Sequence, residues 1–147
     1  MAAPDLESAF PALRTGGCRI TSPADPGYNC VAWAVQDSKR WWDPSREAGY
    51  YWPAGMPAVL SLPSITAVFS AFGFESSPGA GHEPGVDKLA IYANAQGSPT
   101  HVARQLMSGA WTSKLGGGED IEHDALEGLE GELYGKVACV LCRGRAA

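Results

Sequence analysis

The sequence predicts an α+β domain in which N-terminal helices pack on a small antiparallel sheet. Apolar residues recur at helical spacing between residues 29 and 72, and from residue 87 onward they form the short runs typical of strands. Glycine- and proline-rich turns separate these segments without a linker long enough to divide the chain. A chain of 147 residues has the usual length of one domain, so we expect residues 1–147 to form a single domain.

The first predicted helix begins at Asn29, after a loop-rich N-terminal segment of residues 1–27. Its sequence, "CVAWAVQDSKRWW", places apolar side chains on one broad stripe: Val31, Trp33, Ala34, Trp41 and Trp42. Pro44 disfavours a helix before it, so we expect a break at "WWDPS".

A second helix is predicted from "SLPSITAVFSAFGFE", with Ser64 as its N-cap and Gly73 at its end. The apolar stripe of this helix consists of Ile65, Val68, Phe69 and Phe72.

Strands are predicted in the second half of the chain at residues 87–94, 100–106, 110–116 and 136–144. The middle two form a hairpin that is closed by "MSG" or "SGA". Between the third and the last strand, three hinge glycines precede "EDIEHDALEGLEGELYG". This segment predicts a short acidic helix with Asp120 as its N-cap and His123 at its third helical position.

The composition excludes several classes of partner. The net charge is -5, and no basic cluster is present to bind nucleic acid or an anionic membrane. No apolar run approaches the ~20 residues of a membrane-spanning helix. The first residues carry early acidic side chains and no secretory apolar region, and 4 cysteines are too few for a disulfide scaffold. We therefore expect a cytoplasmic protein, and export by a specialised secretion system is compatible with the same sequence.

Cys30 is the first candidate for chemistry because it stands at the start of a predicted helix. Unpaired N–H groups at a helix start favour a thiolate and offer donors to an oxyanion. A nucleophilic thiol also needs a base, which is usually an imidazole. His82 lies in a loop and His123 on the acidic helix, whereas His101 begins a rigid strand, so His101 is the preferred partner.

Each of these residues also has a purely structural interpretation. A cysteine within "CVAWA" is typical of a buried core, and an N-cap role is sufficient to explain Asp120. Cys139 and Cys142, three apart on a strand, point to opposite faces and are poorly placed to share a metal. The aromatic residues of the proline-rich loops either pack in the core or line a groove: Trp41, Trp42, Tyr50, Tyr51 and Trp52.

Two stretches taken together, "YNCVAWAV" and "THVARQLMSGAWTSKLG", resemble the papain-like hydrolases of the NlpC-type and CHAP-type branch. Those families typically have an Asp-Cys-small-residue helix start and a strand that begins with "HVG" followed by Ile or Ala. The resemblance covers the order of elements from Tyr28 to Leu115. The chain also resembles, more closely, a family of small uncharacterised bacterial domains that share "NC.AWA", "HVARQL", "WTSKLG" and "DIEH", a resemblance that brings no established activity.

The resemblance implies a papain-like fold with Cys30 as nucleophile and His101 as general base and then acid. It also implies an oxyanion site at the Cys30 N–H, with Tyr28 or Asn29 nearby. Where papain-like hydrolases carry an oxyanion glutamine, this sequence has Ala24, which departs from the pattern. For the third residue, which orients the imidazole, we favour Asp120; Ser113 and His123 are the alternatives.

The sequence therefore predicts a cysteine hydrolase that cleaves an amide or peptide bond and uses no metal or organic cofactor. The expected partner is a peptide or amide-containing substrate, and a protein partner stays open. The alternative is a catalytically inactive papain-like domain that serves as a binding or immunity module. A third hypothesis is a metal site formed by Cys30, His101 and either His123 or Asp120, which have suitable ligand chemistry but no diagnostic spacing.

Overall fold

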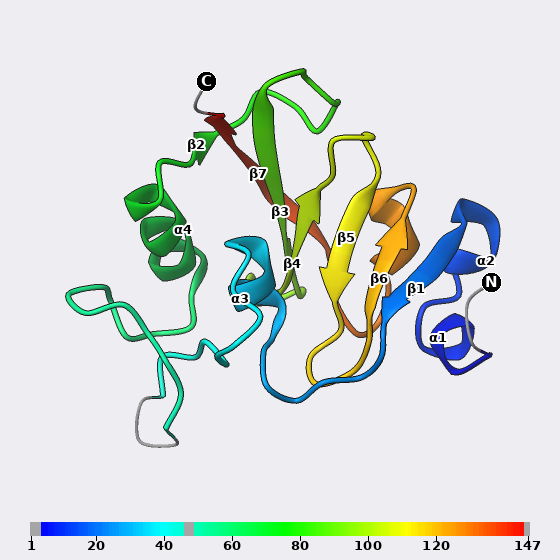
Figure 1. Cartoon of the computed structure of the whole chain (residues 1–147), viewed down its shortest axis with the longest axis horizontal. Helices are drawn as coiled ribbons and strands as arrows, with labels where there is room; N and C mark the ends of the chain where they lie inside the picture. The colour runs from blue at the N-terminus through cyan, green and yellow to red at the C-terminus, as the bar shows by residue number, and fades with distance from the viewer. Residues whose placement is uncertain (1–3, 46–48, 146–147) are drawn as a thin grey trace.

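One antiparallel sheet dominates the computed structural model, which describes residues 4–45 and 49–145. In the described residues the sheet has 7 strands in the order β1-β6-β5-β4-β3-β7-β2 (Figure 1). The strands are β1 (Cys18–Ser22), β2 (Glu75–Ser76), β3 (Val86–Ala93), β4 (Pro99–Gln105), β5 (Trp111–Lys114), β6 (Asp120–His123) and β7 (Lys136–Gly144). The predicted strands at 87–94, 100–106, 110–116 and 136–144 are thus confirmed as β3, β4, β5 and β7.

The helices are short: α1 (Pro4–Ala9), α2 (Leu13–Gly16), α3 (Cys30–Ala34), α4 (Leu62–Ala71) and the 3-10 helix η2 (Leu126–Leu129). The expected papain-like α+β fold, with N-terminal helices packed on a small sheet, is therefore wrong. This is a sheet-rich domain in which the longest described helix has 10 residues. Within the described ranges, no helix has the length and apolar character needed to cross a membrane.

The first predicted helix is much shorter than its apolar pattern indicates. It starts at Cys30 but ends at Ala34, and Gln36 then adopts a left-handed conformation with φ 64°. The Trp42 indole N–H donates to Asp37 Oδ2 at 2.8 Å, and the Trp42 ring packs edge-on against Tyr51. The aromatic residues that suggested a longer helix therefore pack within a loop.

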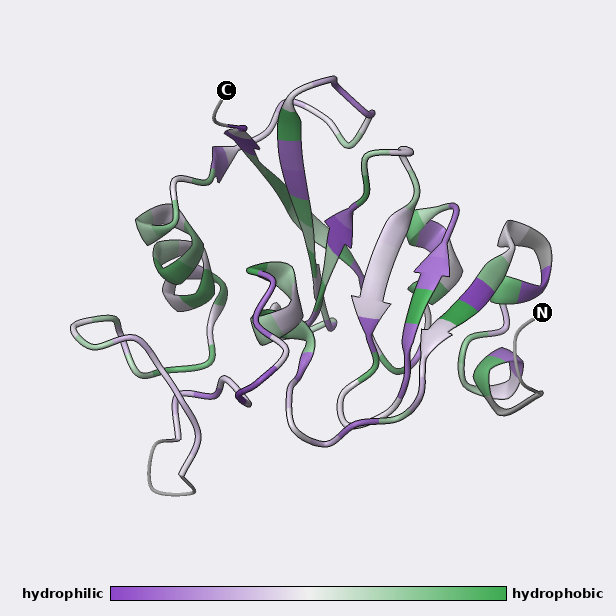
Figure 2. Ribbon diagram, in the orientation of Figure 1, coloured by the Kyte–Doolittle hydropathy of each residue, from purple (hydrophilic) through white to green (hydrophobic). Residues whose placement is uncertain are grey.

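α4 confirms the second predicted helix, although it begins earlier than expected. Ser61, rather than Ser64, is the N-cap, and its hydroxyl oxygen accepts from the Ser64 N–H at 3.2 Å. Pro63 fits in the first turn because it has no N–H to leave unpaired there. Gly73 follows the helix with φ 93°, a conformation that glycine adopts readily. The helix is largely hydrophobic along its length (Figure 2).

The expected acidic helix that begins at Asp120 is also wrong, because these residues form strand β6. β6 pairs with β1 on one side and with β5 on the other. The Asp120 side chain caps no helix and instead accepts hydrogen bonds from the hydroxyls of Tyr28 and Thr21. β1 itself lies in the N-terminal segment expected to be a loop, and its mostly exposed edge residues lack the apolar alternation that marks a strand.

The core consists of two apolar clusters on opposite faces of the sheet. Leu89 and Ile91 of β3 pack with residues of α3 and α4, whereas Ala90 and Tyr92 pack with residues of α1, α2 and η2. A strand buried on both faces has a continuous apolar sequence, which explains the run "LAIYA".

β4 and β5 pair along only part of their length, and this partial pairing creates space for a site. The registered pairs are Arg104 with Thr112 and Gln105 with Trp111, both near the turn of the hairpin. The first half of β4, which includes His101, has no registered partner on β5. α3, which begins with Cys30, packs against both strands (Figure 1).

Candidate active site

Asn29 fixes the start of α3 and joins it to the loop that follows. Its side-chain oxygen accepts from the N–H groups of Ala32 at 3.3 Å and Trp42 at 3.2 Å, and its amide donates to the Trp42 carbonyl at 2.7 Å. The residue is buried, so water does not compete for these bonds. One side chain thus caps the helix that begins with Cys30 and holds the aromatic loop beside it.

We expect Asn29→Ala to reduce the free energy of unfolding by about 3 kcal/mol. The change removes an N-cap worth ~1 kcal/mol and leaves buried backbone groups of Trp42 unpaired at ~1–3 kcal/mol each. Chemical denaturation will measure the loss. Asn94→Ala is the matched control, because Asn94 also accepts two backbone hydrogen bonds but lies on an exposed turn. Equal losses in the two variants would contradict the structural role assigned to Asn29.

His101 lies on β4 with its ring enclosed by aromatic side chains. The imidazole stacks on Tyr134, with ring centroids 4.3 Å apart and planes 2° from parallel, and Tyr92 lies at 5.4 Å. His101 is 2% exposed, yet neither ring nitrogen has a hydrogen-bond partner among the described residues. Leaving a buried polar nitrogen unpaired costs free energy, so the ring is available to a bound molecule.

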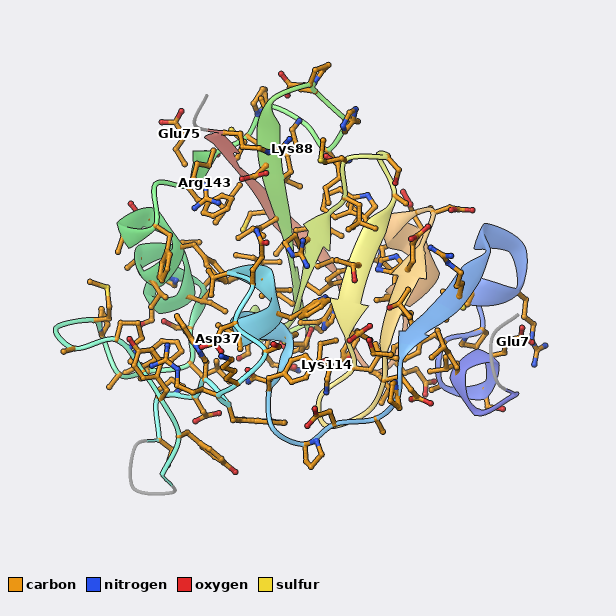
Figure 3. All side chains as sticks on the ribbon, viewed as in Figure 1. Glu7, Asp37, Glu75, Lys88, Lys114 and Arg143 are labelled. Carbon is orange, nitrogen blue, oxygen red and sulfur yellow. The ribbon has the colours of Figure 1, made fainter. Side chains whose placement is uncertain are left out.

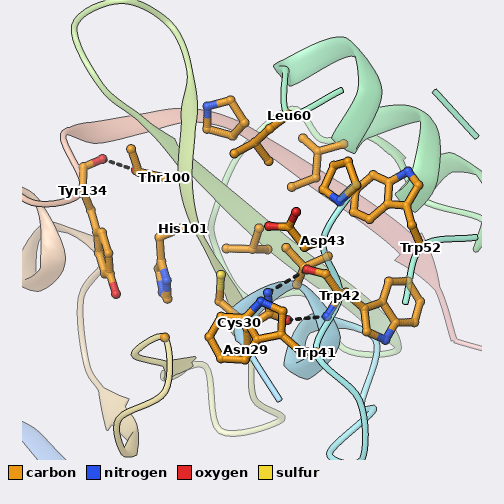
Figure 4. Close-up of a pocket in the computed structure, with 16 residues that line it drawn as sticks. Asn29, Cys30, Trp41, Trp42, Asp43, Trp52, Leu60, Thr100, His101 and Tyr134 are labelled. Atoms are coloured by element: carbon orange, nitrogen blue, oxygen red, sulfur yellow. Dashed lines mark hydrogen bonds between the residues drawn. The ribbon is translucent and has the colours of Figure 1, made fainter. Parts of the chain in front are cut away.

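Cys30 and His101 line the same cavity, which has a volume of about 230 Å³. Figure 4 shows the Cys30 sulfur and the His101 ring toward one side of this cavity, with Trp42 and Trp52 toward the other. Sequence reasoning predicted the pair from a helix start and a strand start. The Tyr134 wall was missed, because no local pattern links Tyr134 to β4.

Burial favours the neutral form of both groups. Burial raises the pKa of the Cys30 thiol, although the backbone N–H groups of Val102 and Val31 and the charge of Lys114 oppose this shift. Burial holds the pKa of His101 well below its ordinary value, and the nearby His123 adds to that effect. Both shifts favour a thiol and a neutral imidazole over the thiolate expected at the helix start.

Lys114 supplies a buried positive charge beside the start of α3 (Figure 3). It is 0% exposed, donates to the carbonyls of Asp25 and Gly116 at 2.6 Å each, and lies 4.5 Å from the centre of the Tyr28 ring. Burial lowers the pKa of Lys114, and the acidic side chains nearby oppose that shift. The charge of Lys114 favours negative charge that develops on the Cys30 sulfur.

The side chains of Tyr28, Asn29 and Asp120, each expected to assist catalysis, are hydrogen bonded elsewhere. The Tyr28 hydroxyl donates to Asp120 Oδ2 at 2.7 Å, and Asn29 binds the loop as described. Asp120 makes no hydrogen bond to His101 among the described residues. The structure therefore brings Cys30 and His101 together but joins Asp120 to Tyr28 and Thr21 instead.

The alternative third residues, Ser113 and His123, are bonded to each other. His123 Nδ1 donates to the carbonyl of Ala125 at 3.0 Å, so its Nε2 accepts from the Ser113 hydroxyl at 2.8 Å. Both side chains are buried. In the part of the chain that the structure describes, the ring of His101 is therefore held by stacking rather than by a hydrogen bond from any of the three predicted residues.

Among the described residues, the four cysteines form no disulfide, and the hypothetical metal site is not assembled. Cys18, Cys30, Cys139 and Cys142 are all free thiols. Among residues 4–45 and 49–145, no three side chains of the metal-binding types come together as ligands, so Cys30, His101 and His123 or Asp120 do not form such a group.

Comparison with known proteins gives a family but no characterised relative. No curated protein and no solved structure matches the chain. Residues 19–142, which include both Cys30 and His101, match a family described as a domain of unknown function. The match covers most of the sequence, and the chain therefore belongs to the family "Domain of unknown function (DUF7689)".

Proposed function

We propose that this protein is a cysteine hydrolase that cleaves an amide or related acyl bond through Cys30 and His101. The observation that carries the proposal is the cavity itself, which a thiol and an imidazole with two unpaired ring nitrogens line together. A nucleophile and a base that share one cavity are the minimal requirement for covalent acyl transfer. The surrounding aromatic walls would bind the substrate and exclude water.

The reaction starts from the neutral pair. As the Cys30 sulfur attacks the carbonyl carbon, a ring nitrogen of His101 takes the thiol proton. The tetrahedral intermediate then expels the leaving group, which receives that proton from His101, and an acyl thioester remains on Cys30. Water attacks the thioester with His101 again acting as base, which releases the acid and restores the thiol.

Two features favour the developing negative charge. The backbone N–H groups of Val31 and Val102 face the sulfur, and the buried charge of Lys114 acts in the same direction. Fixed donors in a water-poor site stabilise charge more strongly than they would in water. The side chains of Tyr28 and Asn29 are already bonded, so backbone donors would serve the oxyanion.

The test is acylation of the intact protein by 4-nitrophenyl acetate. We expect a burst of 4-nitrophenolate equivalent to one site per chain, with the acetyl group found on Cys30 by peptide mass spectrometry. The neutral His101 accepts the thiol proton, so the burst should occur at neutral pH despite the raised pKa of the thiol. Acetylation spread evenly over the four cysteines, or no burst, would refute the proposal.

A second candidate is a binding module without catalysis, and the raised pKa of Cys30 favours it. A partly buried neutral thiol beside aromatic side chains forms an ordinary apolar wall. For either function we propose a reducing compartment such as the cytoplasm, because all four cysteines are free. The net charge of -5 supports a peptide or small acyl compound as partner rather than nucleic acid.

A further inference from the structure

Asp43 places a negative charge in the cavity that holds Cys30 and His101. Of the described residues that line this cavity, Asp43 is the only one with a carboxylate, and none is a lysine or arginine. Figure 4 shows the Asp43 carboxylate within the ring of lining side chains, between Leu60 and Trp42. Asp43 is partly buried, and a single carboxylate on a mostly apolar lining gives the cavity an electrostatic preference for a cation.

The described residues give the Asp43 carboxylate one hydrogen bond and no ion pair. Asp43 Oδ1 accepts from the Ser45 N–H at 2.9 Å, and no ion pair involves Asp43 among the described residues. Arg40, a cation of the same loop, is paired with Asp37 at 3.0 Å and lies over the Tyr51 ring at 3.7 Å. The carboxylate therefore has hydrogen-bonding capacity for a positively charged group in the cavity.

The tryptophans that line the cavity together with Asp43 are also suited to a cationic ligand. Trp41, Trp42 and Trp52 line the same cavity, and the indole ring is the side chain that attracts cations most strongly. The lining therefore combines an ion-pair partner with indole surfaces for the methylenes of an alkylammonium group.

The segment that carries these groups is held in place by backbone bonds. The Asp43 N–H donates to the Tyr51 carbonyl at 2.9 Å, and the Tyr51 N–H donates to the Trp41 carbonyl at 2.8 Å. Asn29 fixes the intervening Trp42 from the opposite side. A carboxylate on a fixed backbone loses little conformational freedom when it binds a ligand.

We infer that the cavity selects a substrate with a cationic alkylammonium group, which Asp43 and the tryptophans bind beside Cys30. The inference rests on the proposed function for the reacting bond, and it adds the substrate class. The chemistry fits a lysine-like side chain or another primary amine on a short alkyl chain.

The test uses n-butylammonium chloride as a probe, with 1-butanol as the neutral analogue and KCl as the salt control. We expect n-butylammonium to change the tryptophan fluorescence saturably and to slow acetylation of Cys30 by 4-nitrophenyl acetate. Asp43→Asn should weaken n-butylammonium binding roughly tenfold or more, because hydrogen bonds to charged groups are the stronger ones. Glu75→Gln removes the same charge from an exposed strand residue and should leave binding unchanged.

The outcomes separate the two claims. If Cys30 is acetylated but n-butylammonium binds no better than 1-butanol, the substrate class is wrong and the hydrolase stands. If n-butylammonium binds through Asp43 but Cys30 is not acetylated, the cationic site stands and the hydrolase fails. Binding that is unchanged in Asp43→Asn, or reduced equally in Glu75→Gln, overturns the assignment to this cavity.

Discussion

Cys30→Ala is expected to abolish the 4-nitrophenolate burst, whereas Cys139→Ala should retain all of it. Alanine has no nucleophile, so no acyl thioester can form at this position. The measurement is burst amplitude per chain, with intact mass spectrometry to count acetyl groups. A retained burst in Cys30→Ala would mean that another residue of the protein reacts.

Cys139 is the matched control because the two thiols share an environment. Both are partly buried against the same apolar cluster, and burial raises the pKa of both. Their alanine variants should therefore lose similar stability, roughly 1 kcal/mol each, the typical cost of a point substitution. If Cys30→Ala unfolds while Cys139→Ala does not, Cys30 serves the core, and the isosteric Cys30→Ser then tests whether packing or reactivity is required.

The strands with continuous or alternating apolar residues could be predicted from the sequence, because a strand that is buried on one or both faces needs apolar residues at regular positions. β3 is an example: it lies inside the sheet between β4 and β7, and its run "LAIYA" is continuously apolar. β1 could not be predicted, because it is an edge strand whose residues mostly face solvent. Pairing with β6, a long-range contact, defines it as a strand.

The errors at β6 and α3 have a common physical cause. Asp120 was interpreted as a helix cap because acidic residues favour solvent and helix starts. In the structure it lies opposite the buried Lys114 on β5, with Tyr28 above it, an arrangement that only the tertiary fold can produce. Similarly, Trp42 has helical spacing in the sequence, but in the structure its ring contacts Tyr51, which belongs to a later segment.

The residues of the candidate site that lie on a helix or a strand could be predicted from the sequence, whereas those that lie on loops could not. Cys30 begins a helix and His101 lies near the start of a strand, so their meeting followed from element order. Asp43 and Tyr134 reach the cavity from segments without periodic structure. The charge of the site, which determines its substrate preference, therefore could not be inferred from the sequence pattern.

His101→Ala is expected to slow acetylation of Cys30 at neutral pH by roughly 10²–10⁴-fold, the usual contribution of a positioned general base. The thiol has a raised pKa and few thiolates form spontaneously, so the base should be essential. His82→Ala is the control, since His82 lies in an exposed loop and does not line the cavity of Cys30 and His101. The folding of both variants is checked by thermal unfolding before rates are compared.

The pH dependence distinguishes a base from a merely structural residue. Burial lowers the pKa of His101 well below 6.5, so the wild-type ring stays neutral through the neutral range and loses activity only when acid protonates it. The wild-type rate should thus be nearly constant from neutral pH to below 6.5. Without His101, only thiolate reacts, so the rate should rise with pH to values above 9.0, the ordinary pKa of the thiol, because burial raises it further. Parallel profiles for the two proteins would show that His101 takes no proton from Cys30, and the cavity would then be a binding site alone.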